Sequence, residues 1–235
     1  MTITVNFVLV AGARLGAWAW DDVVAHLRAA GHGVHPLTLS GLADRQGVPA
    51  GQQTHVQDIV AEVERLDLRE VVLVGHSYAG VPAGQAAARI GDRLAHLVLV
   101  DAALPVEGRS FAAGWPDGGV ALRAAIAGNG GFWPSATATH FEGHGLTDGQ
   151  IARIVAGSTP HPGATLTEPA VLTSPLAELP ATYLLCLLAA AEPDEEVAEL
   201  VADGHWRLVG LDTGHWPMFS RPAELARILL DTAGR

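Results

Sequence analysis

Short runs of β-branched and leucine residues alternate along the chain with longer, helix-compatible stretches. The runs predict six strands, at residues 3–10, 34–39, 71–74, 97–100, 182–188 and 207–211. The intervening stretches predict helices at residues 17–30, 54–66, 78–90, 195–202 and 222–232. This alternation is typical of an α/β protein with a mostly parallel sheet of about six strands flanked by helices. Two of the runs, 71–74 and 97–100, are apolar without strict alternation, as expected of strands covered on both faces.

The alternation breaks between residues 104 and 180, where Gly, Pro and Thr become frequent and aromatic residues are scattered. A structureless loop of that length is uncommon inside a compact domain. We therefore expect a helical cap at approximately 104–180, inserted after the strand that ends at Asp101, with short helices near 119–127 and 148–156. Such a cap would cover a site as a lid.

Composition narrows the class of protein. A chain of 235 residues that is 49% hydrophobic and 17% charged predicts a single domain, residues 1–235, around one core. The net charge of −11, with only 14 Lys and Arg, disfavours nucleic acid and anionic membranes as partners. The partner expected instead is a small, apolar substrate, and the chain is expected to be a monomer or a homodimer.

The cellular location is predicted from three features. No basic segment precedes the first apolar run, and the apolar run at 183–191 is far shorter than the roughly 20 residues of a membrane span. The single cysteine, Cys186, lies in an apolar run, where we expect it to be buried, and has no internal partner for a disulfide. These features predict a cytoplasmic protein.

A turn of small residues at 75–80, Gly-His-Ser-Tyr-Ala-Gly, joins the run 71–74 to a helix-compatible stretch. A strand that enters a helix through such an elbow holds its middle residue in a strained backbone and exposes the side chain. The motif alone also occurs by chance in ordinary turns. Its position between strand and helix favours Ser77 as a nucleophile, whereas His76 is expected to pack beside the turn.

A second signal lies near the end of the chain, where the last predicted strand is followed by Gly-His-Trp-Pro at 214–217. Serine is a weak nucleophile and needs a base within hydrogen-bond reach, so His215 is the expected partner of Ser77. Acyl transfer also needs preorganised donors for the developing oxyanion. By position, the backbone N–H groups of Tyr78 and Ala13 are expected to form that oxyanion hole.

Aromatic residues and histidines suggest what surrounds this pair. We expect Gly12, Trp216 and Trp133 to line the substrate pocket, although tryptophan is more often a core residue. The spacing of His140 and His144 resembles a helical metal motif, but no glutamate completes it and glycines flank His144. We therefore expect no metal and no cofactor.

Several segments together carry a family resemblance. The residues are Phe-Val-Leu-Val-Ala-Gly at 7–12 with Gly-Ala-Trp at 16–18, then 37–45, Gly-His-Ser-Tyr at 75–78, and 214–222. They resemble the α/β-hydrolase fold, and within it the small esterase branch that includes plant methylesterases and hydroxynitrile lyases. The resemblance covers nearly the whole chain outside the cap. It implies a Ser-His-acid triad, an oxyanion hole and a helical cap, mostly without a cofactor.

The chain departs from the family pattern at three places. Ala11-Gly12 stands where the family usually has His-Gly, and Ala79 replaces a glycine of the elbow. The third departure concerns the acid, which the family places near Leu188 or Ala189, neither of which ionises.

The identity of the residue that serves as the acid of the triad therefore stays open. Asp101 is favoured, because it ends the strand 97–100 next to the elbow's own strand, and some related hydrolases place their acid there. Asp194 and Glu192 are the alternatives, although their acidic segment is equally typical of a solvated helix start. A site without any acid is the remaining possibility.

The predicted function is that of a serine hydrolase of the esterase, lactonase or thioesterase type, acting on a neutral, apolar acyl substrate through Ser77 and His215. The missing acid at its usual place motivates one alternative, a cyclase or another enzyme of C–C bond chemistry that uses both residues as hydrogen-bonding or acid/base groups. A ligand-binding receptor is the third. Hydroxynitrile lyase chemistry is disfavoured, because Gly12 and Trp216 stand where those enzymes have a hydroxyl and a lysine.

Overall fold

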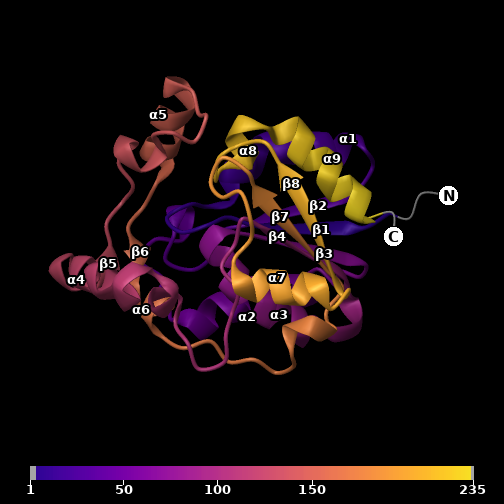
Figure 1. The fold of residues 1–235 in the computed structure, drawn as a ribbon, viewed down its shortest axis with the longest axis horizontal. Helices are drawn as coiled ribbons and strands as arrows, with labels where there is room; N and C mark the ends of the chain where they lie inside the picture. Colours follow the sequence, from indigo (N-terminus) through magenta and orange to yellow (C-terminus); the bar gives the residue numbers. More distant parts are fainter. Residues whose placement is uncertain (1–3, 234–235) are drawn as a thin grey trace.

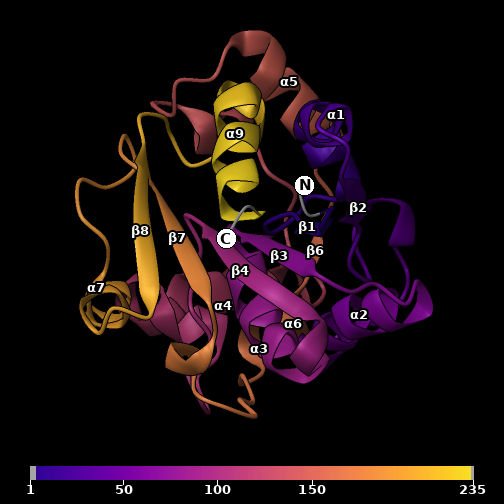
Figure 2. The same ribbon diagram turned by 90° about the vertical axis from the view of Figure 1, so that its right-hand side faces the viewer.

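A six-stranded parallel sheet forms the centre of the molecule in the computed structural model, which describes residues 4–233. Its strand order is β2-β1-β3-β4-β7-β8, with β8 at one edge and β2 at the other (Figure 2). The strands are β1 (Asn6–Val10), β2 (Gly33–Leu37), β3 (Val71–His76), β4 (Leu94–Val100), β7 (Ala181–Cys186) and β8 (Trp206–Leu211). The predicted parallel sheet is confirmed, with strand ends moved by a few residues; Ile3, where the first prediction begins, lies outside the described residues.

Helices cover both faces of this sheet, as expected of a parallel sheet (Figure 1). One face carries α1 (Asp21–Ala29), α8 (Pro217–Ser220) and α9 (Pro222–Ala233), and the other carries α2 (Gln52–Arg65), α3 (Gly80–Ile90) and α7 (Glu195–Ala202). Alternate side chains of each strand enter opposite cores. In β3, for example, Leu73 packs with α2 and α3, whereas Val72 and Val74 pack on the face of α1 and α9.

The segment between β4 and β7, here called the insertion (residues 104–180), lies to one side of the sheet (Figure 1). It contains α4 (Val120–Gly128), α5 (Asp148–Gly157) and α6 (Gly163–Thr167), and a small antiparallel pair of β5 (Phe132–Trp133) with β6 (His161–Pro162). The helices expected near 119–127 and 148–156 correspond to α4 and α5. The β5–β6 pair and α6 were not predicted, because two-residue strands carry no periodicity.

Single 3-10 turns complete the described structure. They are η1 (Ala17–Trp20), η2 (Ala43–Arg45), η3 (Ser77–Ala79), η4 (Gly91–Arg93), η5 (Phe111–Gly114), η6 (Pro116–Gly119), η7 (Ala138–Phe141) and η8 (Leu176–Glu178). None of the helices in residues 4–233 has the length and apolar character needed to cross a membrane. In a parallel sheet the loops that leave the carboxyl ends of the strands meet at one edge, and the loops after β1, β3, β4, β7 and β8 are among them here.

Candidate active site

Ser77 occupies a strained turn between β3 and α3. Its φ is +55°, in the left-handed region that residues other than glycine rarely adopt. Small neighbours make the turn possible: a Cβ on Gly75 would lie 2.9 Å from the Ala79 carbonyl oxygen, and one on Gly80 would lie 2.3 Å from the carbonyl oxygen of Ala103. The predicted elbow is therefore present, and it holds Ser77 at the carboxyl edge of the sheet.

His215 lies between Ser77 and a carboxylate. Its Nε2 is 2.8 Å from the Ser77 Oγ, and its Nδ1 is 2.5 Å from the Asp101 Oδ2. The Asp101 carboxylate accepts a hydrogen bond from Nδ1–H, which leaves the Nε2 lone pair free to accept a hydrogen bond from the Ser77 hydroxyl. The three side chains come from the ends of β3, β4 and β8, three elements far apart in the sequence.

The Asp101 carboxylate is held by backbone groups of the adjacent strand. Its Oδ1 accepts the Cys186 N–H at 3.2 Å, and its own N–H donates to the Leu184 carbonyl at 2.7 Å. Cys186 is buried in β7, as the sequence indicated. Burial, and to a smaller extent the neighbouring Asp101, raise the pKa of the Cys186 thiol far above its usual range. The thiol therefore stays protonated at neutral pH.

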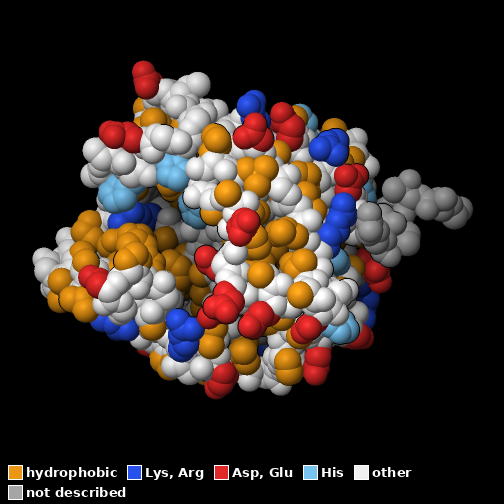
Figure 3. All heavy atoms as spheres, in the orientation of Figure 1, with side chains coloured by type: hydrophobic (Ala, Val, Ile, Leu, Met, Phe, Trp, Pro, Cys, Tyr) orange, Lys and Arg blue, Asp and Glu red, His pale blue; other side chains and the backbone are white. Residues whose placement is uncertain are grey.

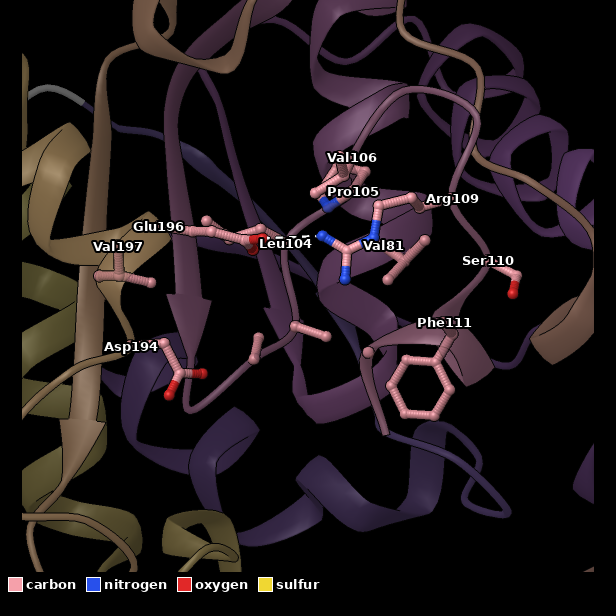
Figure 4. Close-up of a pocket in the computed structure, with 13 residues that line it drawn as sticks. Val81, Leu104, Pro105, Val106, Arg109, Ser110, Phe111, Asp194, Glu196 and Val197 are labelled. Atoms are coloured by element: carbon pink, nitrogen blue, oxygen red, sulfur yellow. Dashed lines mark hydrogen bonds and ion pairs between the residues drawn. The ribbon is translucent and has the colours of Figure 1, made fainter. Parts of the chain in front are cut away.

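The two alternative acids lie elsewhere. Glu192 and Asp194 line a cavity of about 350 Å³ that Ser77 also borders, and within residues 4–233 neither hydrogen-bonds to His215. Asp194 also borders a smaller pocket of about 120 Å³ between the start of the insertion and α7 (Figure 4). Figure 4 shows Arg109 reaching across this pocket to Glu196, with which it pairs at 3.0 Å. Neither Ser77 nor His215 is among the described residues that line the pocket of Figure 4.

The backbone N–H groups of the loop after β1 differ in their hydrogen bonds. The Gly12 N–H donates to the His76 Nδ1 at 3.3 Å, and the Arg14 N–H donates to the His161 Nδ1 at 3.0 Å. Between them, the Ala13 N–H has no hydrogen-bond partner among residues 4–233, and Ala13 lines the same cavity as Ser77. Tyr78 follows Ser77 directly, and its own side chain is buried against His55.

Gly12 and His76 explain how this loop reaches the nucleophile. A Cβ on Gly12 would lie 2.8 Å from both the Ser77 Cβ and the His76 Nδ1, so a larger residue would displace the elbow. The His76 Nε2–H donates to the His215 carbonyl at 2.7 Å. His76 therefore packs beside the turn, as expected, but it also ties the loop after β1 to the loop of His215, a role that the sequence did not indicate.

Three histidines near the site, His55, His76 and His161, are completely buried and hydrogen-bonded. Burial lowers the pKa of His55 to about 4 and holds the pKa values of His76 and His161 well below the usual range. All three are therefore neutral in the folded protein at pH 5.5, whereas an unfolded chain takes up protons on them below a pH of about 6.5.

This difference predicts acid sensitivity. The free energy of unfolding should fall as the pH falls below about 6.5, by about 1.4 kcal/mol per pH unit for each of the three histidines. Urea denaturation at pH 7.5 and 5.5 checks the expectation, and the loss between them should be about 4 kcal/mol. An equal free energy of unfolding at both values would contradict it.

A cavity of about 450 Å³ opens beside Ser77 and His215, between the sheet and the insertion. The predicted pocket residues Gly12, Trp133 and Trp216 all line it, together with three further aromatic residues, Phe111, Trp115 and Phe141. Figure 3 shows the surface hollowed at this place, with hydrophobic side chains gathered on the side of the insertion.

The two histidines of the metal-like spacing have separate hydrogen bonds. The His140 Nδ1 contacts the Thr137 Oγ1 at 2.8 Å, and the His144 Nδ1 accepts the His215 N–H at 3.2 Å. His144 thus supports the loop of His215, which the sequence did not indicate. In the part of the chain that the structure describes, no three His, Cys, Asp or Glu side chains are grouped to hold a metal ion.

Known proteins resemble this chain along most of its length. The model of the alpha/beta hydrolase family matches residues 7–228. A carbendazim hydrolyzing esterase of Nocardioides sp. (strain SG-4G) is 32% identical over 95% of this chain and 98% of its own length. Esterase PIR7B of Oryza sativa subsp. japonica is 37% identical, over 44% of this chain and 41% of its own. The solved structure of an extracellular alpha/beta-hydrolase from a Paenibacillus species superposes with a TM-score of 0.84, over 98% of this chain and 99% of its own. Its sequence is 22% identical, so this likeness supports the shared fold and nothing further.

These relatives confirm two predictions made from the sequence. The resemblance to esterases of this fold is confirmed by the names of the relatives, and with it the prediction of an ester-hydrolase-like enzyme. The family match begins in β1 and ends within α9, so it includes the elbow and the loop of His215. The chain belongs to the alpha/beta hydrolase family.

Proposed function

We propose that this chain is a serine esterase in which Ser77 is the nucleophile, His215 the general base and Asp101 the acid that orients it. The observation that carries the proposal is the continuous hydrogen-bonded series from the Ser77 Oγ through both ring nitrogens of His215 to Asp101. An imidazole held in this tautomer removes the hydroxyl proton as the oxygen attacks.

The reaction follows from this geometry. The Ser77 oxygen bonds to the ester carbonyl carbon while His215 takes its proton, and the negative oxygen that forms accepts hydrogen bonds from the N–H groups of Ala13 and Tyr78. His215 then gives the proton to the departing alcohol, which leaves an acyl-Ser77. Water, deprotonated by the same histidine, attacks the acyl carbon and releases the carboxylic acid with free Ser77.

The substrate class is argued from the cavity that contains Ser77. Its lining is predominantly apolar and aromatic, which favours an ester, lactone or thioester with an apolar acyl part. Within the described lining there is no Asp or Glu, and Arg14 is the only Lys or Arg. The esterase names of the relatives support hydrolysis over a binding role.

Covalent labelling tests the nucleophile. A fluorophosphonate probe should modify the folded protein at one site, and peptide mass spectrometry should place the adduct on Ser77, because its hydroxyl has His215 in reach and lies in a strained, partly exposed turn. A Ser77→Ala variant should stay unlabelled, and a Ser158→Ala variant, changed in the insertion, should label as the parent does. Unmodified Ser77 in a folded preparation would contradict the proposal.

A further inference from the structure

One arginine lines the cavity of Ser77 with its side chain almost wholly buried. Arg14, which belongs to the loop after β1, is 6% exposed and has a φ of +69°. The insertion fixes its backbone from both sides, since its N–H donates to the His161 Nδ1 and its carbonyl accepts the Thr159 N–H at 3.0 Å. A non-glycine residue in this strained conformation is held there by its surroundings.

The guanidinium of Arg14 packs on an aromatic ring and pairs with no acidic side chain among the described residues. Its Cζ lies 3.4 Å from the centre of the Trp133 ring, so the aromatic ring covers one flat face. Its Nε is buried without a hydrogen-bond partner, and within residues 4–233 the side chain makes no ion pair. Burial lowers the pKa of Arg14 only to about 10, so the group is charged at neutral pH.

A charge in this position is costly unless something pairs with it. A stacked aromatic ring stabilises the face of a guanidinium but leaves the N–H groups at its edge without acceptors. The described lining of the cavity provides no carboxylate. A role confined to stacking on Trp133 would leave the buried Nε–H unpaired, and it would leave the other guanidinium N–H groups at the cavity without an acceptor among residues 4–233.

We propose that Arg14 is a specificity-determining residue that binds a carboxylate of the substrate, and that the preferred substrates are esters bearing a free carboxylate beyond an apolar or aromatic spacer. The inference rests on the proposed function and changes one prediction, that of a neutral substrate. Guanidinium and carboxylate match in geometry and form paired hydrogen bonds in one plane. The apolar lining of the cavity then contacts the spacer.

The second cavity beside Ser77 supports this placement. It is lined by Asp101, Glu192 and Asp194, and it would repel an anion. Ser77 and His215 border both cavities. A substrate that extends into both cavities would thus place its carboxylate with Arg14 and its uncharged part on the acidic side. The overall charge of −11 does not prevent binding, because charges on the surface are screened within about 8 Å at physiological salt.

Matched esters test the proposal. One pair is the 4-nitrophenyl half-ester of glutaric acid and 4-nitrophenyl pentanoate, which differ by a carboxylate on the acyl side. The other is 4-acetoxybenzoate and 4-methylphenyl acetate, which differ on the alcohol side. For at least one pair, kcat/KM should favour the charged member by about 10- to 100-fold, mainly through KM. Arg14→Met should abolish that ratio, Arg14→Lys should restore part of it, and the control Arg109→Met should leave it unchanged.

A binding measurement separates this inference from the proposed function. Calorimetry with glutarate and benzoate on Ser77→Ala protein should give a Kd that weakens at least tenfold when Arg14→Met is added. Arg14-dependent binding without hydrolysis of any ester would overturn the esterase and leave the inference standing. Hydrolysis with a ratio and a Kd that do not respond to Arg14→Met would overturn the inference alone. If Arg14→Met does not fold, Arg14→Gln and Arg14→Lys carry the same comparison.

Discussion

Replacing Ser77 by alanine should lower ester hydrolysis by a factor on the order of 10⁵ to 10⁶, because the variant has no oxygen to form the acyl intermediate. The change removes one atom from a partly exposed turn, so the fold should persist. Steady-state rates with a chromogenic ester, together with circular dichroism and thermal unfolding of both proteins, give the measurement.

The same variant distinguishes hydrolysis from the alternative chemistry. An enzyme of ring closure or C–C bond chemistry uses Ser77 only as a hydrogen-bonding group, and its loss then costs far less than the loss of a nucleophile. Turnover within about tenfold of the parent protein would therefore contradict the esterase and favour the non-hydrolytic enzyme.

Replacing Asp101 by asparagine should lower kcat by a factor on the order of 10³ to 10⁴. The amide keeps the size of the side chain but does not stabilise the imidazolium that forms at His215, and it permits the wrong tautomer. The Cys186 N–H still finds an oxygen acceptor, so the strands β4 and β7 should stay paired. Single-turnover rates, with a thermal unfolding measurement on each variant, test this.

Two control variants test whether the loss of activity is specific to the Asp101 carboxylate. Asp194→Asn and Glu192→Gln remove the alternative acids, neither of which hydrogen-bonds to His215 in the described part of the chain. Both should keep kcat within about threefold of the parent. Full activity in Asp101→Asn together with a large loss in Asp194→Asn would show that the acid has been assigned wrongly.

The central sheet could be predicted because its strands are runs of several strongly apolar residues. The runs at 71–74 and 97–100 became β3 and β4, buried between two helical layers, and each is long enough to carry a signal. Phe132 and Trp133 form a strand of two residues, and its partner β6 is equally short. Such pairs depend on contacts across the insertion, which no local pattern records.

The proposed nucleophile and base were predictable for a different reason. Ser77 and His215 each follow a strand within a local motif, so their positions at one edge of a parallel sheet follow from topology. The acid was not fixed in this way, because Asp101, Glu192 and Asp194 all follow strands of the same edge. Only the distance of 2.5 Å between Asp101 and His215 distinguishes them.

Other contributors to the site have no sequence signal at all. Arg14 lies in a loop otherwise made of small and apolar residues, and the ring that it contacts is more than a hundred positions away in the chain. His161 and His76 look like ordinary histidines, and only the structure reveals which backbone N–H each accepts. Long-range pairs of this kind are set by packing and not by spacing.

The position of Asp101 has a consequence for the loop that leaves β7. In the proposed mechanism the acid is Asp101, which follows β4 and accepts the Cys186 N–H, so residues 187–194 take no part in proton transfer. Glu192 and Asp194 in this loop instead form a wall of the second cavity. If the proposed mechanism holds, a change in the length or charge of this loop should alter what the second cavity accepts and leave the hydrogen bonds among Ser77, His215 and Asp101 intact.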